Sequence, residues 1–331
     1  MTRKPPRPWL ELMEKNEAIV KKDFETDMKY GKRPDERTVE ELLDMGIAVI
    51  DKPCGPSSHE VSAWARRIIG ANKTGHSGTL DPRVSGVLPV GFNRSTRGMS
   101  YLAKSDKEYV CAMRYHAKLS DEKIRSVMGK FVGELTQTPP VRSAVARRPR
   151  KRKVYYLNIL EINSPEVLFA VGCQAGTYVR KLCFDMGKLA GCGAHMSELR
   201  RTKAGVFSEK DSHSLQDLSD AYWLWKEKGQ DGEIRACVLP FESSVSLKKL
   251  WVADQAVEAL CSGAPLAAPG ISRLEKGFAQ GDDVAIFTLK GELVSFGKAL
   301  VGWEGALSME KGLVTTTEKV MMKKGTYPRC W

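Results

Sequence analysis

Apolar positions recur along the chain at two different spacings, and these spacings predict a mixture of strands and helices. The short apolar run 47–50, which ends at Lys52, predicts a strand. Ser57 and Glu60 form a capping-box pattern for a helix that Gly70 ends. The apolar face expected for this helix consists of Val61, Trp64, Ala65 and Ile68.

The same pattern continues through the middle of the chain. We expect a glycine-rich loop over 75–86 and strands over 86–91, 108–116, 154–163 and 166–174. One short helix begins after Ser120, and another runs over 177–190 with Thr177 as its cap. The apolar face expected for the second helix consists of Val179, Leu182, Met186 and Leu189.

The two ends of the chain differ from this middle. Residues 1–40 are polar, charged and interrupted by prolines, which predicts an arm rather than an independent domain. Beyond about residue 247 we expect a helix over 256–260 and strands over 284–289, 292–300 and 314–320. Lys290 and Gly291 lie where the first two of these strands would turn into a hairpin. The C-terminal part is therefore predicted to be a small all-β module.

Composition and charge narrow the class of protein. The 331 residues are 42% hydrophobic, which excludes disorder along the whole chain, and the length fits about two domains. No apolar stretch approaches the ~18 residues that span a bilayer, and no apolar run follows the basic first residues, so we expect neither a secreted nor a membrane protein. A net charge of +12 favours a polyanionic partner.

Metal ions and redox cofactors have no recognisable site in the sequence. No two of the eight cysteines have zinc-knuckle or redox-pair spacing, and the five histidines include no pair at metal-ligand spacing. A dinucleotide-binding glycine fingerprint is also missing. We expect no metal, no cofactor, and thiols kept in a reducing cytoplasm or nucleus.

A basic segment lies in the middle of the chain. Its charged residues are Arg142, Arg147, Arg148, Arg150, Lys151, Arg152 and Lys153, with no acid among them. Pro149 interrupts the segment, so we expect a projecting loop, and clustered positive charge on a loop is suited to binding phosphate. A solvated surface or a nuclear import signal is the alternative.

Candidate chemistry is concentrated in the segment 75–82, Gly-His-Ser-Gly-Thr-Leu-Asp-Pro. Asp81 stands before a proline in a loop that leads into an apolar strand, and a carboxylate held this way serves as a nucleophile or a base. An aspartate that caps backbone N–H groups in an Asx turn is the alternative. His76, taken alone, is typical of a packed core histidine. The patterns of a P-loop and of a serine-hydrolase elbow do not match.

A second candidate is Arg180, in the first turn of the helix expected after Gly176. Its position is offset from the apolar face, so the side chain can reach a carboxylate elsewhere in the fold. An exposed helix charge is the alternative.

Four motifs together resemble, in order and spacing, those of the TruB family of pseudouridine synthases. They are the segment with Asp81, Lys107-Glu108-Tyr109-Val110, Gly-Thr-Tyr-Val-Arg ending at Arg180, and Leu199-Arg200-Arg201-Thr202. The likeness runs from about Phe24 to the end and sharpens to the dyskerin-like branch, the catalytic subunit of box H/ACA ribonucleoproteins. That narrower resemblance is carried by Asp51-Lys52-Pro53 with 55–61, by Pro139-Pro140, and by the tail 325–331.

The resemblance implies an α+β fold. A catalytic domain on a mixed, mainly antiparallel sheet flanked by helices is expected over 41–246, and a small β-barrel PUA domain over 247–331. The arm, 1–40, is expected to pack on the PUA domain. No lysine-rich tail follows Trp331, which is typical of an archaeal, cytoplasmic chain or of a trimmed eukaryotic chain from the nucleolus or nucleus.

The resemblance also implies the reaction. The C1′–N1 glycosidic bond of a uridine is cut, the uracil turns, and it is rejoined through C5, which needs no metal or cofactor. Asp81 is then the nucleophile or a proton acceptor, and Arg180 pairs with it and keeps it ionised. Tyr109 stacks on the extruded base with its hydroxyl near the C5 proton. Leu199 closes the other side of the pocket, and His76 takes part in flipping the nucleotide.

RNA contacts are implied at several further places. Lys52 and His59 belong to the motif of the narrower branch, and 147–153 becomes a thumb loop that closes over the substrate strand. The PUA residues Gly263, Gly270 and Lys276 are expected to meet the lower stem and terminal trinucleotide of a guide RNA. Pro265 departs from the family, whose members often have aspartate there.

The expected partners are an H/ACA guide RNA, a substrate rRNA or tRNA, and small core proteins of the Nop, Gar and ribosomal L7-like types, with no membrane. A stand-alone synthase acting on a tRNA T-loop is one alternative, and an RNA-binding scaffold that has lost catalysis is another. Asp81, Tyr109 and Arg180 together argue against the scaffold. The PUA module and the arm favour the guided enzyme over the stand-alone one.

Overall fold

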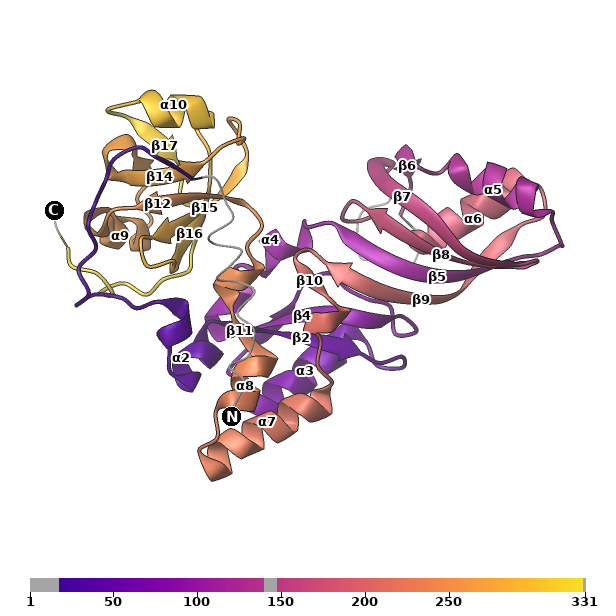
Figure 1. Cartoon of the computed structure of the whole chain (residues 1–331), viewed down its shortest axis with the longest axis horizontal. Coiled ribbons are helices and arrows are strands. Elements are labelled where there is room, and N and C mark those ends of the chain that lie inside the picture. Colours follow the sequence, from indigo (N-terminus) through magenta and orange to yellow (C-terminus); the bar gives the residue numbers. More distant parts are fainter. Residues whose placement is uncertain (1–17, 140–147, 330–331) are drawn as a thin grey trace, which may run out of the picture.

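Two β-sheets organise the computed structural model, which describes residues 18–139 and 148–329 (Figure 1). The larger sheet contains β2 (Gly46–Lys52), β3 (Thr74–His76), β4 (Ser85–Phe92), β5 (Lys107–Tyr115), β6 (Gly133–Gln137), β7 (Arg150–Asn163), β8 (Glu166–Cys173), β9 (Ala194–Ala204), β10 (Phe207–Ser208) and β11 (Val238–Pro240). Its main strand order is β11-β2-β4-β9-β5-β8-β7-β6, while β3 pairs with β4 and β10 with β9. A short contact between β4 and β9 is parallel, and the other pairings within this sheet are antiparallel.

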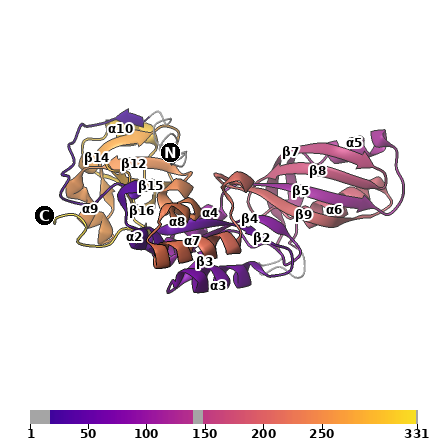
Figure 2. The same ribbon diagram turned by 60° about the horizontal axis from the view of Figure 1, so that its bottom comes forward.

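Helices lie against this sheet in two groups (Figures 1 and 2). The first group, beside β2 and β4, consists of α3 (Ser58–Ile69), α7 (Leu215–Lys228) and α8 (Gly232–Cys237), and the second, beside β5 and β8, consists of α5 (Asp121–Gly129) and α6 (Val179–Ala190). The short helices α2 (Val39–Asp44) and α4 (Met99–Ala103) lie toward the C-terminal module. This arrangement confirms the predicted mixed, mainly antiparallel sheet with flanking helices. Across 18–139 and 148–329, no helix is both long enough and apolar enough to cross a membrane.

The capping pattern predicted for α3 is present at both ends. Ser57 Oγ accepts a hydrogen bond from the backbone N–H of Glu60, whose carboxylate accepts one from the Ser57 N–H at 2.8 Å. Gly70 ends the helix with φ +64°, a left-handed conformation that favours glycine. The buried face consists of Ser58, Val61, Ser62, Ala65 and Ile69. Trp64 was expected on that face but is 39% exposed, so the buried stripe is narrower than the apolar pattern predicts.

α6 begins two residues later than the predicted range 177–190. Thr177 Oγ1 donates to the Gln174 carbonyl at 2.7 Å within the preceding turn, and Tyr178 occupies the N-cap position, so the prediction that Thr177 caps the helix is wrong. The buried face consists of Val179, Leu182, Cys183, Met186 and Gly187. Leu189 is 47% exposed and does not belong to it. The first turn of α6 still contains Arg180, beside the buried face.

The C-terminal module contains a six-stranded sheet of order β1-β14-β12-β15-β16-β18 and the separate pair β13-β17. The bounds are β1 (Ala18–Val20), β12 (Lys248–Val252), β13 (Leu266–Ala267), β14 (Ile271–Glu275), β15 (Asp283–Thr288), β16 (Leu293–Lys298), β17 (Leu313–Thr315) and β18 (Lys319–Val320), with helices α9 (Asp254–Cys261) and α10 (Trp303–Ser308). The predicted hairpin is confirmed, since β15 and β16 pair antiparallel and Gly291 turns between them with φ +83°. The strand expected over 314–320 is instead divided between β17 and β18.

The described part of the arm is attached to this module. β1 pairs antiparallel with β14 and forms the edge strand of the sheet. Lys21 Nζ donates to the carbonyl oxygens of Ala306 and Leu307 near the C-terminus of α10, at 2.6 and 3.0 Å. Thr26 Oγ1 and the Asp27 N–H donate to the Asp254 carboxylate at the start of α9. These contacts give a polar segment a fixed place on a folded surface.

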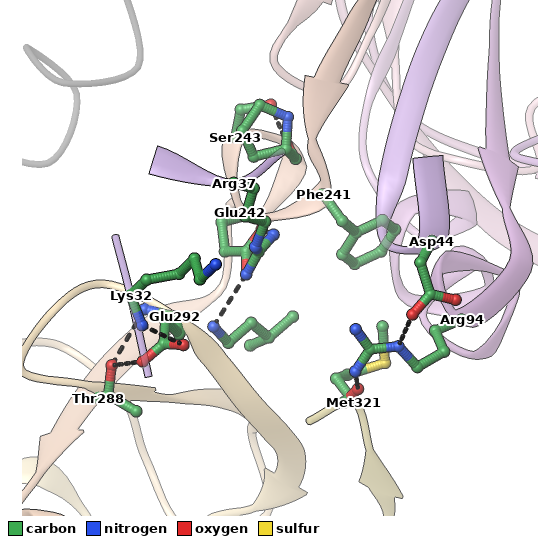
Figure 3. A network of polar contacts seen from close by, with 12 residues as sticks. Lys32, Arg37, Asp44, Arg94, Phe241, Glu242, Ser243, Thr288, Glu292 and Met321 are labelled. Atoms are coloured by element: carbon green, nitrogen blue, oxygen red, sulfur yellow. Dashed lines mark hydrogen bonds and ion pairs between the residues drawn. The ribbon is translucent and has the colours of Figure 1, made fainter. Parts of the chain in front are cut away.

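One buried hydrophobic cluster and a network of polar contacts connect the two sheets. Figure 3 shows the polar contacts. Phe241 and Phe296, from opposite sides of the boundary, belong to the same buried cluster. Arg37 donates two hydrogen bonds to the buried Glu242 carboxylate, at 2.9 and 2.6 Å, and that carboxylate also accepts from the Leu293 N–H of β16 at 3.2 Å. The module is therefore held in one orientation relative to the larger sheet.

Candidate active site

Asp81 lies in the loop that connects β3 to β4, and hydrogen bonds to α3 hold this loop in place. Ser58 Oγ, buried in the first turn of α3, accepts from the Leu80 N–H at 2.8 Å and donates to the Leu80 carbonyl at 3.0 Å. The Asp81 carbonyl accepts from the Val84 N–H at 2.9 Å, which closes the loop. The backbone on both sides of Asp81 is thus fixed, and the carboxylate projects outward.

The carboxylate of Asp81 pairs with Arg180 of α6. Arg180 Nη2 donates to Asp81 Oδ2, and each of the two side chains is 53% exposed. The fold therefore brings together, from positions 99 residues apart, the carboxylate and the guanidinium that were predicted to pair. Because both groups remain open to solvent, the pair is accessible to a substrate.

Tyr109 of β5 lies directly across from Arg201 of β9 in the strand register. The Arg201 guanidinium and the Asp81 carboxylate both lie close enough to the Tyr109 hydroxyl to influence its pKa. Leu199, two positions before Arg201, therefore points to the same face of β9. Tyr109 and Leu199 are both half-buried and pack against one apolar cluster. The structure thus groups Asp81, Arg180, Tyr109 and Leu199 at one place.

His76, at the end of β3, is half-buried beside this group. Its ring meets the ring of the exposed His59 edge-on, with 4.8 Å between centroids. Burial, helped by the nearby His59 and Arg201, lowers the pKa of His76 to about 4. His76 is therefore neutral at pH 7, and its ring is available for packing or hydrogen bonding rather than for binding phosphate as a cation.

Lys52 does not occupy the place that the RNA-binding prediction requires. It is 0% exposed, and its Nζ donates to the carbonyls of Pro53 and Val84 at 2.8 Å and of Pro82 at 3.2 Å. Burial lowers the pKa of its ammonium group. The expectation that Lys52 contacts RNA is wrong, because the side chain instead fixes the segment that follows Asp81.

The basic segment is a strand over most of the length that the structure describes. Residues 150–153 form the start of β7 and pair with β6, so the prediction of a loop there is wrong, while Arg142 and Arg147 lie outside the described residues. Arg148, Arg150, Lys151 and Lys153 are exposed, and Lys151 pairs with Glu134 at 2.8 Å. The half-buried Arg152 lies over the turn at Gly176, where an added Cβ would stand 3.1 Å from its Nε. The charges therefore extend along a strand toward the turn before α6.

The three candidate RNA contacts in the C-terminal module lie near two different elements. Gly263 is exposed with φ +92° just after α9, beside a hollow of about 500 Å³. Gly270 packs on the same helix, since an added Cβ would stand 3.0 Å from Ala256 Cβ. Lys276 is exposed directly after β14. The structure brings the two glycines, but not Lys276, to α9.

Arg201 and Lys107 are site residues that the sequence predictions did not single out. Arg201 is 1% exposed, and Lys107 is buried with its Nζ directed at the carbonyls of Leu102 and Ala103. Burial lowers the pKa of Lys107 to about 8. Lys107 lies on the same face of β5 as Tyr109, and Arg201 lies on the same face of β9 as Leu199. Because side chains alternate along a strand, the motif sequences alone would have placed Lys107 and Arg201 on the face that carries the site. Within 18–139 and 148–329, no group of three or more His, Cys, Asp or Glu side chains could hold a metal ion.

Comparison with known families assigns each part of the chain. The N-terminal domain of TruB family pseudouridylate synthases matches residues 66–179, and the tRNA pseudouridylate synthase B C-terminal domain matches 180–246. The PUA domain matches 248–321, and the DKCLD (NUC011) domain matches 7–62.

Whole proteins match over nearly the full length. A probable tRNA pseudouridine synthase B of Methanopyrus kandleri is 49% identical over 316 residues, which are 95% of this chain and 94% of the relative. That of Methanocaldococcus jannaschii is 48% identical over 319 residues, 96% of this chain and 95% of the relative.

Solved structures match as closely. A chain in the archaeal box H/ACA sRNP Nop10-Cbf5 complex aligns with TM-score 0.89 and 46% identity, over 96% of this chain and 99% of that one. A chain in an H/ACA RNP bound to a substrate RNA containing 2′-deoxyuridine aligns with TM-score 0.90 and 45% identity, over 96% and 98%. The agreement of motifs, fold and whole-chain similarity shows that the chain belongs to the TruB family of pseudouridine synthases.

Proposed function

We propose that this protein is the catalytic subunit of an H/ACA ribonucleoprotein, where a guide RNA directs it to isomerise selected uridines of rRNA, and also of tRNA, to pseudouridine. The observation that carries this proposal is the whole-chain alignment with chains of H/ACA particles at TM-scores of 0.89 and 0.90. That alignment includes the arm and the C-terminal module as well as the catalytic residues. The partners are then the guide RNA, the substrate RNA and small core proteins, as in the Cbf5-Nop10-Gar1 complex, which aligns at TM-score 0.91.

The geometry supports a role for each residue at the site. Asp81 attacks the sugar or the base, or accepts a proton, and Arg180 orients its carboxylate. Tyr109 stacks on the extruded uracil with its hydroxyl toward C5, while Leu199 covers the other side. His76 takes part in flipping the nucleotide as a neutral ring. The isomerisation breaks the C1′–N1 bond, forms a C1′–C5 bond, and releases a proton from C5 while N1 gains one, so it is redox-neutral.

The division of labour follows from the fold. We assign 1–40 to an arm on the PUA domain, 41–246 to the catalytic domain and 247–331 to the PUA domain. The β1–β14 pairing supports the placement of the arm, and the interface at Arg37 and Glu242 supports a fixed spacing between guide and active site. His59, the exposed β7 charges, Gly263, Gly270 and Lys276 are the proposed RNA contacts. The relatives described above are archaeal, so we place the particle in the cytoplasm of an archaeal cell.

A stand-alone tRNA enzyme is the second candidate function. The relatives from Methanopyrus kandleri and Methanocaldococcus jannaschii, each named as a probable tRNA pseudouridine synthase B, favour it. The active site described above would serve both functions, so the two differ in what delivers the uridine.

Release of tritium from C5-labelled uridine tests the two candidates against each other. The protein is incubated alone with tRNA, and separately with a guide RNA, its complementary substrate and the small core proteins. Release in the assembled reaction, dependent on guide complementarity, is the expected result. Release from tRNA by the protein alone, together with none in the assembled reaction, would overturn the guided function in favour of the stand-alone one.

A further inference from the structure

Arg201 is a buried cation beneath the loop of Asp81. The residue is 1% exposed, and its guanidinium donates to the carbonyls of Val87 at 2.7 Å, Gly78 at 3.1 Å and Ser77 at 3.5 Å. In the described ranges no salt bridge joins it to a carboxylate. A buried charge without a counter-charge costs several kcal/mol. We therefore ask what Arg201 does at this position.

Two glycines make room for Arg201. Gly78 has φ +75°, and a Cβ added to it would stand 3.1 Å from Arg201 Nη1. Gly86 has φ +105°, and its Cβ would stand 2.2 Å from the Arg201 carbonyl oxygen. The loop that carries Asp81 therefore begins and ends against the backbone or side chain of Arg201.

The same guanidinium reaches Tyr109. The two residues are register partners on β5 and β9, which places the guanidinium beside the phenol, close enough to influence its pKa. A guanidinium has five N–H donors and no acceptor, so in any hydrogen bond between the two groups the phenol oxygen must accept. The O–H hydrogen of Tyr109 is then directed away from Arg201.

We propose that Arg201 is a positioning residue that fixes the loop of Asp81 and the Tyr109 hydroxyl in one geometry, and that it turns the Tyr109 O–H toward the space occupied by the uracil. This inference rests on the proposed place of Tyr109 in the uracil pocket. Arg201 contacts no reacting atom and acts through the two residues that do.

The charges around Tyr109 determine what removal of Arg201 would change. The titratable groups near the Tyr109 hydroxyl are Arg201 of β9, Cys173 of β8 and Asp81 of the β3–β4 loop. Arg201 in turn lies close enough to Lys52, His76 and Lys107 to lower the pKa of each. Burial raises the pKa of Tyr109, and Arg201 opposes that rise. A neutral residue at position 201 should therefore raise the pKa of Tyr109 further.

The test is a fluorine NMR titration of the full-length protein with a fluorinated tyrosine at position 109. Ring fluorination makes the phenol more acidic, so that its titration falls at a lower pH than that of tyrosine. We expect the midpoint in Arg201→Met to rise by about one pH unit, a typical effect of one nearby charge, and the midpoint in Arg201→Lys to stay close to that of the parent. Arg201→Gln replaces the Met variant if the latter does not fold. Arg200→Met is the matched control, because Arg200 pairs with Asp51 across the sheet and should leave the midpoint unchanged.

A tritium-release assay supplies the second readout. Arg201→Met should lower kcat at least tenfold with little change in KM, and Arg201→Lys should restore part of the loss. An unchanged titration midpoint in the neutral variants would overturn the role of Arg201 and leave the proposed function standing. A raised midpoint in the neutral variants, together with a parent protein that releases no tritium, would instead overturn the proposed function alone.

Discussion

The Asp81 carboxylate and the Arg180 guanidinium form an ion pair between the β3–β4 loop and the first turn of α6. Each side chain is 53% exposed, and a pair so exposed contributes at most about 1 kcal/mol to stability. The pair is therefore expected to affect the orientation of the carboxylate rather than the free energy of unfolding. This distinction separates a catalytic pair from a structural one.

Arg180→Ala should lower kcat on the order of 100-fold, because Asp81 loses the group that orients it. The free energy of unfolding should change by less than about 1 kcal/mol. Tritium release and urea denaturation measure the two quantities. Arg114→Ala, which breaks an exposed pair with Glu166, should change neither. A variant that loses stability and activity in proportion would show that Arg180 is structural.

Arg37→Met should destabilise the protein by about 3–5 kcal/mol, because it leaves the buried Glu242 carboxylate without its partner. The double variant Arg37→Met/Glu242→Gln removes both charges, and part of the loss should be recovered. Chemical denaturation of the two variants checks this. A loss below 1 kcal/mol in the single variant would mean that the ion pair does not hold the two sheets together.

Replacing Arg148, Arg150 and Lys151 with alanine should weaken binding of substrate RNA and make it less dependent on salt. Each lost phosphate contact reduces the slope of log K against log salt by about 0.7 to 0.9. Filter binding over a series of salt concentrations gives the slope. The control removes three exposed charges elsewhere, Arg66, Arg67 and Lys228, and should preserve it. Equal slopes in both triple variants would mean that Arg148, Arg150 and Lys151 are solvated surface charges that do not contact RNA.

His76 should make the protein less stable as the pH falls from about 6.5 to about 4. Its pKa is lowered from 6.5 in the unfolded chain to about 4 in the fold, so the unfolded state binds a proton first across this range. The loss should be on the order of 3 kcal/mol and absent from His76→Gln. His195→Gln is the control and should retain the wild-type pH dependence. Parallel curves for wild type and His76→Gln would contradict the burial of a neutral ring.

The sequence predicted the elements that depend on local signals. The capping box at Ser57, the hairpin at Gly291 and the strands around the site are present because their signals lie within a few residues of one another. The prediction that Asp81 pairs with Arg180 came from the family motifs, because spacing alone does not indicate contact between two residues 99 positions apart.

What the sequence did not predict depends on contacts made in three dimensions. Lys52 is expected at the surface because it is a lysine, yet three backbone carbonyls hold it in the interior. Residues 150–153 have the composition of a loop, but β6 supplies a partner strand for them. Arg201 was part of a recognised motif, and only its burial beneath Gly78 and Tyr109 identifies what it does.

The central claim is that Asp81 carries out the isomerisation, and Asp81→Asn tests it most directly. The measurement is single-turnover tritium release in the assembled, guided reaction, with RNA affinity determined on the same samples and Asp185→Asn as the matched control. We predict that the Asp81 variant releases no tritium while it binds RNA as the wild type does, and that the control releases it at the normal rate. Release at the wild-type rate from Asp81→Asn would contradict the account.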